Sequence, residues 1–401
     1  MIIWVMPDSG ARTKEDYELL RRLFEKEHPG VELTVRVFTR NVLWRKIFML
    51  KNPAPEEEIP DLVQIPHYWT ALLTRAGVAE NLSKLDPGLS LSNVLFPLKP
   101  HCYRPGTKDI HSYPWWFDMS ALHFRGDHLK MVSAHPEEEL ATWDGLLSVC
   151  EALKRAFRDN PGYYPMQNSD WRGSLSVRCA LPAVWDRGAE LFSPDLKTCL
   201  INTPQFKAGF KDYITLAIKE YMPILRERGS LGTMVSGKAS ILISRKQGVA
   251  SFDTKRGLRV KTVPVPTTGN VYYSYLSGMN LIVNVLSKEK ENALKFIKWC
   301  ARADNQIRYA GMMEVFPAFE DSFEQFIFSS ARRLQTYSNI LASSKTLPNI
   351  TVTGTVMEIL NKVFAVSATD IVEERFTMAG LDRALDNACK EINHLLSLYE
   401  G

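Results

Sequence analysis

The sequence predicts an α/β fold in a chain that is long enough for two domains. Strand and helix patterns alternate over the first 77 residues, and this alternation is typical of a mostly parallel sheet with helices on both faces. The chain has 401 residues, more than one ordinary hydrophobic core encloses. Its apolar fraction of 45% and charged fraction of 23% are those of a soluble globular protein.

The spacing of apolar residues predicts the strands and helices of the N-terminal part. Ile2 to Met6 form an apolar run closed by a Pro-Asp-Ser-Gly turn, which predicts a strand. Between 13 and 26 apolar residues recur every three or four positions, so a helix is expected there. From 31 to 37 apolar and polar residues alternate, as in a half-buried strand. A helix at 42–48, a strand at 61–65 and a helix at 68–76 complete the series.

Weaker patterns predict the remaining elements. Thr142 is a favourable cap for a helix that runs to about Phe157, with Asp144 in its first turn. The stretch 160–172 is rich in Gly, Pro, Tyr and Asn and indicates a loop. Further strands are expected at 121–124, 237–243, 260–265 and 281–283, and further helices at 175–185, 204–227, 287–300, 322–338, 355–366 and 381–399.

Polar and aromatic side chains follow the first and third predicted strands. Asp8 and Ser9 come after the first, and His67, Tyr68 and Trp69 after the third. In open α/β sheets the ligand crevice lies at the carboxyl ends of the strands. These residues are therefore candidate ligand contacts, and the alternative is that they are ordinary solvated loop residues.

The stretch from Ser112 to Asp118 combines three adjacent aromatic residues with one carboxylate. An indole face stacks on the C–H groups of a pyranose, and a carboxylate accepts hydrogen bonds from sugar hydroxyls. Trp115 and Trp116 are neighbours, so on a strand they face opposite sides and only one can enter a given core. The other is a candidate stacking group, with core packing as the competing interpretation.

Composition and motifs argue against several other classes. Lys and Arg total 49 against 45 acidic residues, with no basic stretch interleaved with aromatics, so nucleic-acid binding is not expected. No apolar run approaches the roughly 18 to 20 residues of a membrane span. Met1 is followed at once by the apolar run of the first strand, without a signal-peptide pattern. The six cysteines are widely separated, which argues against a zinc or thioredoxin-type site and leaves disulfides undecided.

A set of short phrases follows a fixed order along most of the chain. They include Trp4 to Gly10, Phe24 to Val31, Pro60 to Gln64, Tyr113-Pro114 with Asp118, Thr142 to Asp144, Ser236 to Ala239, Pro264 to Pro266, Ser277 to Leu281, Ala293 to Trp299 and Phe316-Pro317. Each phrase alone is weak, but their order resembles the extracellular solute-binding proteins of sugar ABC importers, the group that includes maltose-, trehalose- and glycerol-phosphate-binding proteins.

The resemblance implies a two-lobed periplasmic-binding-protein-like fold of type II. Each lobe would have its own mostly parallel sheet flanked by helices, with the ligand cleft between the lobes. Residues 1–117 and 265–316 would form the N-terminal lobe, and 118–264 and 317–401 the C-terminal lobe. The three crossings would lie near 116–118, 263–266 and 316–319, and the lobes would close on the ligand as a hinge.

The same resemblance implies a non-catalytic receptor for a mono-, di- or short oligosaccharide. Its partners would be the carbohydrate and the transmembrane subunits of an ABC importer, and it would need no cofactor or metal. It would work as a monomer outside the cytoplasm, in a periplasm or as a lipoprotein on the cell surface, with the signal segment absent from this chain.

Several positions match the ligand contacts of the family. The expected set is Asp8, Ser9, Tyr68, Trp69, Trp115, Trp116, Asp118, Trp171, Gln247, Gly278, Met279 and Asn280. Two departures stand out, because many relatives carry a Trp where this chain has Arg245-Lys246-Gln247, and a Gly-Trp-Asn segment where it has Gly278-Met279-Asn280. Fewer stacking planes favour a smaller or more polar ligand over a long oligosaccharide.

Two alternatives stay open. Paired carboxylates beside a sugar are also the catalytic pattern of glycosidases, although the common nucleophile, metalloprotease and phosphate-loop motifs are absent from the sequence. The receptor fold could instead take a polyamine, a ferric complex or a phosphorylated polyol. Tyr272-Tyr273 is a formal candidate for iron, and Arg12 or Arg172 for phosphate.

Overall fold

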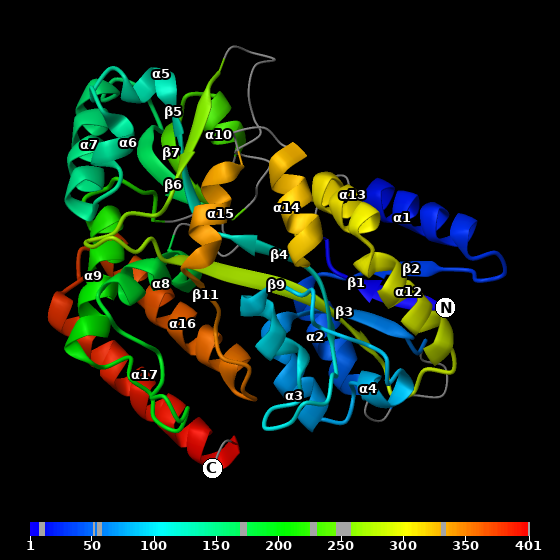
Figure 1. The fold of residues 1–401 in the computed structure, drawn as a ribbon. Helices are drawn as coiled ribbons and strands as arrows, with labels where there is room; N and C mark the ends of the chain where they lie inside the picture. The colour runs from blue at the N-terminus through cyan, green and yellow to red at the C-terminus, as the bar shows by residue number, and fades with distance from the viewer. Residues whose placement is uncertain are drawn as a thin grey trace. The chain divides into compact units, whose positions relative to one another are not determined.

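The computed structural model divides the chain into two compact units (Figure 1). It describes residues 1–7, 13–50, 53, 58–168, 175–224, 231–245, 258–329 and 334–399. Unit 1 comprises Met1–Asp118, Ser277–Ser329 and Thr346–Thr353, and unit 2 comprises Met119–Leu276, Ser330–Lys345 and Gly354–Gly401. Within the described residues, no helix is both long and apolar enough to cross a bilayer.

The larger sheet has the strand order β10-β4-β9-β3-β1-β2, and β11 pairs with β9. Its strands are β1 (Ile2–Val5), β2 (Thr34–Val37), β3 (Leu62–Pro66), β4 (Tyr113–Met119), β9 (Ser274–Val283), β10 (Phe316–Pro317) and β11 (Ser344–Lys345). β1 pairs in parallel with β2 and β3, whereas β9 runs antiparallel to β3 and β10 antiparallel to β4. The sheet is therefore mixed, with its parallel part formed by the first three strands.

Helices cover both faces of this sheet in unit 1 (Figure 1). On one face lie α1 (Thr13–Glu27), α12 (Lys290–Ala301), α13 (Ala303–Met313) and α14 (Glu320–Ser329). On the other face lie α2 (Arg40–Met49) and α3 (Thr70–Arg75). The unit also contains the short elements η2 (His67–Trp69), α4 (Leu82–Leu85) and η3 (Phe96–Cys102). Side chains alternate along each strand, so apolar residues point to both faces of the sheet and helices pack on both. Trp4 and Val63 share a buried cluster with Leu43 and Ile47 of α2, while Phe24 of α1 packs edge-on against the Phe296 ring at 5.0 Å.

Unit 2 has a four-stranded sheet of order β6-β7-β5-β8. Its strands are β5 (Ala121–Arg125), β6 (Tyr164–Asn168), β7 (Ala239–Ser244) and β8 (Val260–Val263). Only β6 and β7 are parallel, because β5 runs antiparallel to both β7 and β8. The α/β class is confirmed, but the expectation of a mostly parallel sheet is wrong for this unit. β5 follows β4 after one residue, so no crossover helix sets its direction.

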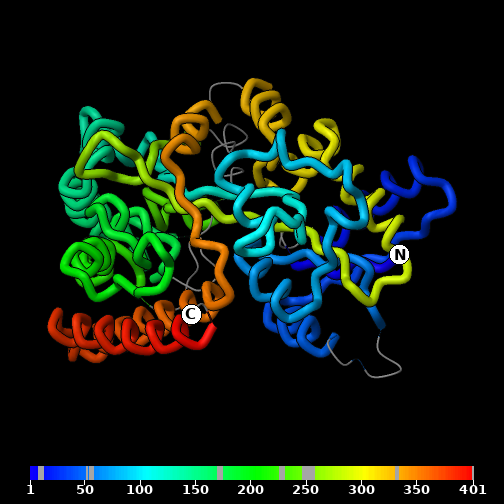
Figure 2. Tube along the Cα trace, turned by 60° about the horizontal axis from the view of Figure 1, so that its bottom comes forward, coloured from blue at the N-terminus to red at the C-terminus, as the bar shows by residue number. Residues whose placement is uncertain are grey.

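The helices of unit 2 are α5 (Gly126–Leu129), α6 (Pro136–Glu139), α7 (Trp143–Ala156), α8 (Val177–Asp186), α9 (Pro204–Ile218), α10 (Leu231–Val235), α15 (Gln335–Ala342), α16 (Thr353–Val372) and α17 (Met378–Tyr399). α16 and α17 lie side by side in both views (Figure 1, Figure 2). α9 joins both, since Phe210 stacks on Phe364 of α16 at 4.0 Å and the Lys207 ammonium lies 2.6 Å from the Asp386 carboxylate of α17. The C-terminal helices are therefore part of the core of unit 2.

Most predicted elements are confirmed, and the exceptions have local causes. Thr142 caps α7 as expected, accepting a hydrogen bond from the Gly145 N–H at 3.1 Å. The loop expected at 160–172 contains strand β6, whose five residues include a proline and lack the alternating pattern. β9 begins seven residues before the expected position 281, because its first half is rich in small and polar residues.

The units divide the chain after Asp118, Leu276, Ser329, Lys345 and Thr353, and the expected lobe boundaries after 117, 264 and 316 stay a prediction. The first division falls after Asp118, one residue from the expected position. The second falls after Leu276, because the chain passes from unit 2 to unit 1 within the continuous strand β9. The third falls after Ser329, because α14 packs with α13 and β10 in unit 1.

Candidate functional site

The carboxyl ends of the parallel strands β1, β2 and β3 meet at one edge of the unit 1 sheet. Met6 follows β1, Thr39 and Arg40 follow β2, and His67 follows β3. The Met6 N–H donates to Oε1 of Gln64 on β3 at 2.7 Å, which holds the ends of β1 and β3 together inside the protein. Asp8 and Ser9, expected on the first loop, lie outside the described residues.

Arg40, Tyr68 and Trp69 form a cluster at this edge. The Arg40 guanidinium donates to the Tyr68 hydroxyl at 2.5 Å, and its carbon lies 5.1 Å from the Trp69 ring centre. Trp44 of α2 packs against Trp69 with ring centres 4.4 Å apart. The structure thus brings Tyr68 and Trp69 together with a cation that the sequence reading missed. The same carboxyl-edge rule, applied to the strand ending at Val37, would have found Arg40.

Trp115 belongs to the core of unit 1. Its side chain is 1% exposed and stacks on Tyr309 at 4.7 Å, with Phe296 and Tyr17 beside it. These partners come from α13, α12 and α1, which cover this face of the sheet. The competing core interpretation therefore describes Trp115 best, and its packing gives no support to a ligand contact.

Trp116 and Asp118 point to the opposite face of β4, because side chains alternate along a strand. Their side chains are 4% and 5% exposed. The Trp116 indole Nε1 is buried and has no hydrogen-bond partner among the described residues. A buried donor without an acceptor is costly, so this N–H is a candidate for a hydrogen bond to a group that is not part of the chain.

Asn280 is satisfied within unit 1. Its amide Nδ2 donates to the Ser112 hydroxyl at 2.8 Å and to the His101 carbonyl at 3.2 Å, and the Thr70 hydroxyl shares a hydrogen bond with that of Ser112 at 3.0 Å. This network ties β9 to the segment before β4 and to α3. Both Nδ2 donors of Asn280 are therefore used within unit 1, and its role in ligand binding stays a prediction.

Gly278 and Met279 have packing roles as well. A Cβ on Gly278 would lie 3.2 Å from the His67 ring and 3.3 Å from the Trp116 carbonyl, so this position leaves little space for a side chain. Met279 pairs with Pro66 on β3 and packs against the cluster that contains Tyr68 and Trp69. The Gly-Met-Asn segment thus positions the edge residues through backbone and core contacts.

Two stacked histidines lie beneath this edge. The rings of His67 and His101 are parallel within 10°, with centres 3.9 Å apart, and both are buried. His101 Nε2 shares a hydrogen bond with the Thr346 hydroxyl at 2.9 Å. Burial lowers the pKa of His101 to about 3, so this ring is neutral at ordinary pH.

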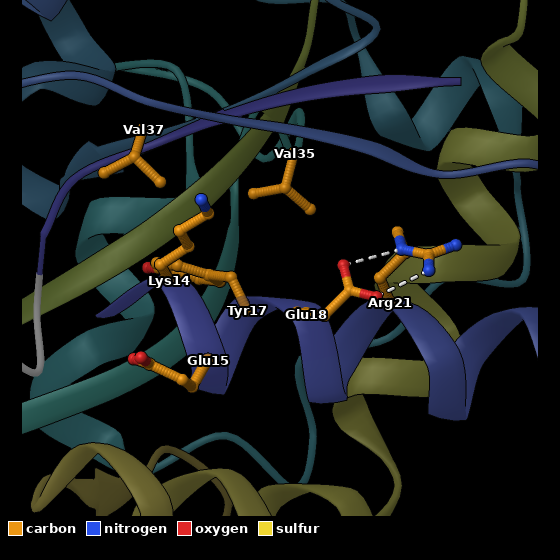
Figure 3. A pocket seen from close by; sticks show the side chains of 7 residues that line it. All are labelled: Lys14, Glu15, Tyr17, Glu18, Arg21, Val35 and Val37. Carbon is orange, nitrogen blue, oxygen red and sulfur yellow. Dashed lines mark hydrogen bonds and ion pairs between the residues drawn. The ribbon is translucent and has the colours of Figure 1, made fainter. Parts of the chain in front are cut away.

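Two open hollows in the described parts of the units are lined by residues other than the expected site residues. One, of about 450 Å³, lies between α1 and the edge strand β2, with Val35 and Val37 pointing toward the helix (Figure 3). Its charged rim is self-paired, since Arg21 bonds Glu18 at 2.6 Å and holds the pKa of that carboxyl below its usual value. Another, of about 650 Å³, is lined by Arg187–Glu190 and neighbouring residues of unit 2. Trp171 and Gln247 lie outside the described residues.

The family model of bacterial extracellular solute-binding proteins matches residues 20–334 of the chain. The chain belongs to this family. The comparison with curated protein sequences gives no significant match. The expected family is thereby confirmed, on a match that covers both units.

Solved structures share the fold of this solute-binding protein at low sequence identity. A Thermotoga lettingae ABC transporter solute-binding protein bound with α-D-tagatose has a TM-score of 0.83 at 16% identity, with 99% of both chains covered. Maltose-bound T. maritima MalE3 has a TM-score of 0.81 at 19% identity, covering 98% of this chain and 100% of that one. The GacH receptor of Streptomyces glaucescens, solved unliganded and with acarbose, has a TM-score of 0.80 at 18% identity over 99% of both chains. These likenesses confirm the two-lobed α/β fold.

The core position of Trp115 leads to a stability prediction. Trp115→Ala is expected to lower the free energy of unfolding by about 3 to 5 kcal/mol, because it leaves a cavity between β4 and three helices. Urea unfolding followed by circular dichroism measures this. Phe96→Ala, at a side chain that is 78% exposed in the same unit, is the control and should change stability by less than about 0.5 kcal/mol. A loss below about 1 kcal/mol for Trp115→Ala would contradict the core assignment.

The buried His101 makes stability depend on pH. Its pKa is about 3 in the folded protein and near 6.5 when unfolded, so the unfolded chain binds more protons between these values. The stabilisation is present above pH 6.5 and is lost as the pH falls toward 3. His101→Gln should therefore remove about 3 kcal/mol of the destabilisation that the wild type shows between pH 7 and pH 4.

Urea unfolding of both proteins at several pH values tests this expectation. His123 of unit 2 has its pKa lowered to about 3 by burial as well, so the wild type also loses stability through that residue. The difference between wild type and His101→Gln isolates His101. His135→Gln, at an exposed histidine, is the control. Parallel pH profiles for wild type and His101→Gln would disprove the assignment.

Proposed function

We propose that this chain is the substrate-binding receptor of an ABC importer and binds a mono-, di- or short oligosaccharide without chemically changing it. The family match over residues 20–334 carries the proposal. The solved structures of similar fold are described with tagatose, maltose and acarbose, which supports a carbohydrate as the ligand. Members of such a family act as receptors, so we propose no catalytic residue for this chain.

Unit 1 supplies the proposed ligand edge. Tyr68 and Trp69 offer aromatic surface, and the Arg40 guanidinium beside them offers hydrogen-bond donors. Trp116 presents a buried indole N–H, with Asp118 two residues along the same face of β4. A sugar hydroxyl can accept from the indole and donate to the carboxylate, and charge-assisted bonds of this kind contribute about 1.5 to 3 kcal/mol each. Asp8, Ser9, Trp171 and Gln247 are proposed to complete the contacts.

Binding is proposed to be coupled to a hinge motion of the two units. The chain passes from one unit to the other after Asp118, within strand β4, and after Leu276, within strand β9. A ligand that touches both units favours a closed arrangement by its differential affinity for that state. The closed form would be the one that the transmembrane subunits recognise. We further propose that the receptor is a monomer and works outside the cytoplasm.

A sugar that carries an anionic group is a second candidate ligand. The observation that favours it is the position of Arg40, whose planar guanidinium suits a carboxylate or phosphate. An iron complex is disfavoured at Tyr272-Tyr273, because the Lys345 ammonium lies 4.9 Å from the Tyr273 ring centre and would repel a cation.

A ligand panel tests the proposed function. Thermal shift is measured with neutral mono- and disaccharides, sugar phosphates, sugar acids, polyamines and ferric citrate, followed by calorimetry on every compound that raises the Tm. We expect one sugar class to raise the Tm, because a ligand that binds only the folded state stabilises it by mass action. At a hundred times the Kd the stabilisation is about 2.7 kcal/mol, which corresponds to a shift of several degrees.

The outcomes of this panel are distinct. A response to neutral sugars supports the first candidate, and a response to sugar phosphates or sugar acids supports the second. Incubation of each binding sugar with the protein, followed by chromatography, should return the sugar unchanged. Turnover would contradict the receptor proposal in favour of an enzyme, and a response only to polyamines or iron would contradict the carbohydrate ligand.

The unpartnered indole of Trp116 leads to a site prediction. Trp116→Phe keeps an aromatic ring and removes the N–H, so affinity for the sugar identified by the panel should fall about tenfold, the equivalent of about 1.4 kcal/mol. Calorimetry measures the change. Trp115→Phe, on the opposite face of the same strand, is the matched control and should keep the wild-type affinity. Unchanged binding by Trp116→Phe would remove Trp116 from the site.

A further inference from the structure

Two buried thiols of unit 2 lie against each other although they are far apart in sequence. Cys199 pairs with Phe192 through an antiparallel β-bridge that closes a short hairpin. Cys389 lies on α17. Their side chains are 2% and 3% exposed. The Cys389 Sγ donates to the Cys199 carbonyl at 3.4 Å, so the two residues are in direct contact. Both residues are reduced in the structure.

Asn393 fixes both cysteines from one side. Its Oδ1 accepts from the Cys199 N–H at 2.7 Å, and its Nδ2 lies 3.6 Å from the Cys389 Sγ. α17 is held in addition by ion pairs to α9, in which Lys207 and Lys211 lie 2.6 and 3.0 Å from their carboxylate partners. The thiols are thus kept together by the surrounding structure on both segments, and not by the flexibility of either side chain.

The environment of the Cys102 thiol differs from that of Cys199 and Cys389. Its thiol donates to the Leu98 carbonyl one turn earlier in η3, at 3.6 Å, so the sulfur is directed to its own segment. Cys300 lies on α12 in unit 1, while Cys199 and Cys389 belong to unit 2. The hairpin and α17 therefore bring two cysteines into contact, whereas Cys102 presents a single buried thiol.

We propose that Cys199 and Cys389 are a redox pair that closes into a disulfide when the chain folds under oxidising conditions. The oxidant is a disulfide, either glutathione disulfide or a protein dithiol oxidase. One cysteine thiolate attacks it and forms a mixed disulfide with release of one thiol. The second cysteine then attacks this mixed disulfide and releases the other thiol. Two electrons and two protons leave the protein, and two thiols of the oxidant are formed.

The first attack, which forms the mixed disulfide, takes place before α17 has docked. In the folded protein the two sulfurs are shielded from solvent, and burial raises the pKa of the Cys199 thiol, so little of the reactive thiolate is present. In the unfolded chain both thiols are accessible. Folding then brings the hairpin and α17 together and closes the bond. The closed bond ties the C-terminal helix to the hairpin across a long loop, which stabilises the folded state by restricting the unfolded one.

The test is to refold the full chain in a glutathione buffer that contains both the thiol and the disulfide. The refolded protein is denatured in acid, its free thiols are alkylated, and it is digested for mass spectrometry. We expect one linked peptide pair that joins Cys199 to Cys389, and alkylation of Cys102, Cys150, Cys179 and Cys300. Recovery of Cys199 and Cys389 as alkylated thiols would overturn the proposal, and this readout needs no variant.

Thermal unfolding with and without a reductant provides the second readout. The Tm of the oxidised wild type should fall by about 5 to 10 °C when dithiothreitol is present throughout. Cys389→Ala should show the same Tm in both conditions, because it cannot form the bond. Cys300→Ala, a variant at another buried cysteine, is the control and should keep the full response to dithiothreitol. A wild type that is insensitive to dithiothreitol, or a Cys389→Ala variant that still responds, would overturn the proposal.

Discussion

The alternation of side chains along β4 is the constraint on which the rest of unit 1 depends. β4 is an interior strand between β10 and β9, and all of its residues are buried, so both of its faces are covered. Trp115 and Phe117 fill one face, where Phe117 stacks on Phe316 of β10 at 5.5 Å. Trp116 and Asp118 take the other. A slip of one residue would move both tryptophans to the wrong faces, so the aromatic core also fixes the register of the candidate ligand residues.

The parallel part of the sheet supplies the second half of the candidate site. Because β1, β2 and β3 run in the same direction, the residues that follow them gather at one edge. The Arg40 guanidinium lies over the Tyr68 and Trp69 rings and is bonded to the Tyr68 hydroxyl. Contacts of this kind hold a long side chain in one orientation. The edge therefore presents an ordered surface before any ligand binds, which reduces the entropic cost of binding.

The sequence was most informative where local pattern and tertiary structure agree. The spacing of Tyr17, Leu20 and Phe24 predicted α1 because one helical face alone meets the sheet. β6 was missed because strand pairing to β7, a long-range contact, overrides a sequence that contains Pro165. The unit division after Leu276, within β9, was not expected for a related reason. A continuous strand has no turn at the point where the chain changes units.

Candidate site residues were harder to predict than elements, because residue type does not reveal which hydrogen bonds are already made. Asn280 carries an amide suited to a sugar, yet Ser112 and the His101 carbonyl use its donors. Trp116 carries the same indole as Trp115, and only the structure shows that one lies among three helices while the other has a buried N–H without a partner in the described chain. The network of Asn280, the neutral His101 ring and the close approach at Gly278 hold β9 against β4. The segment that matches the ligand contacts of the family thus also contacts the strand that carries Trp116 and Asp118.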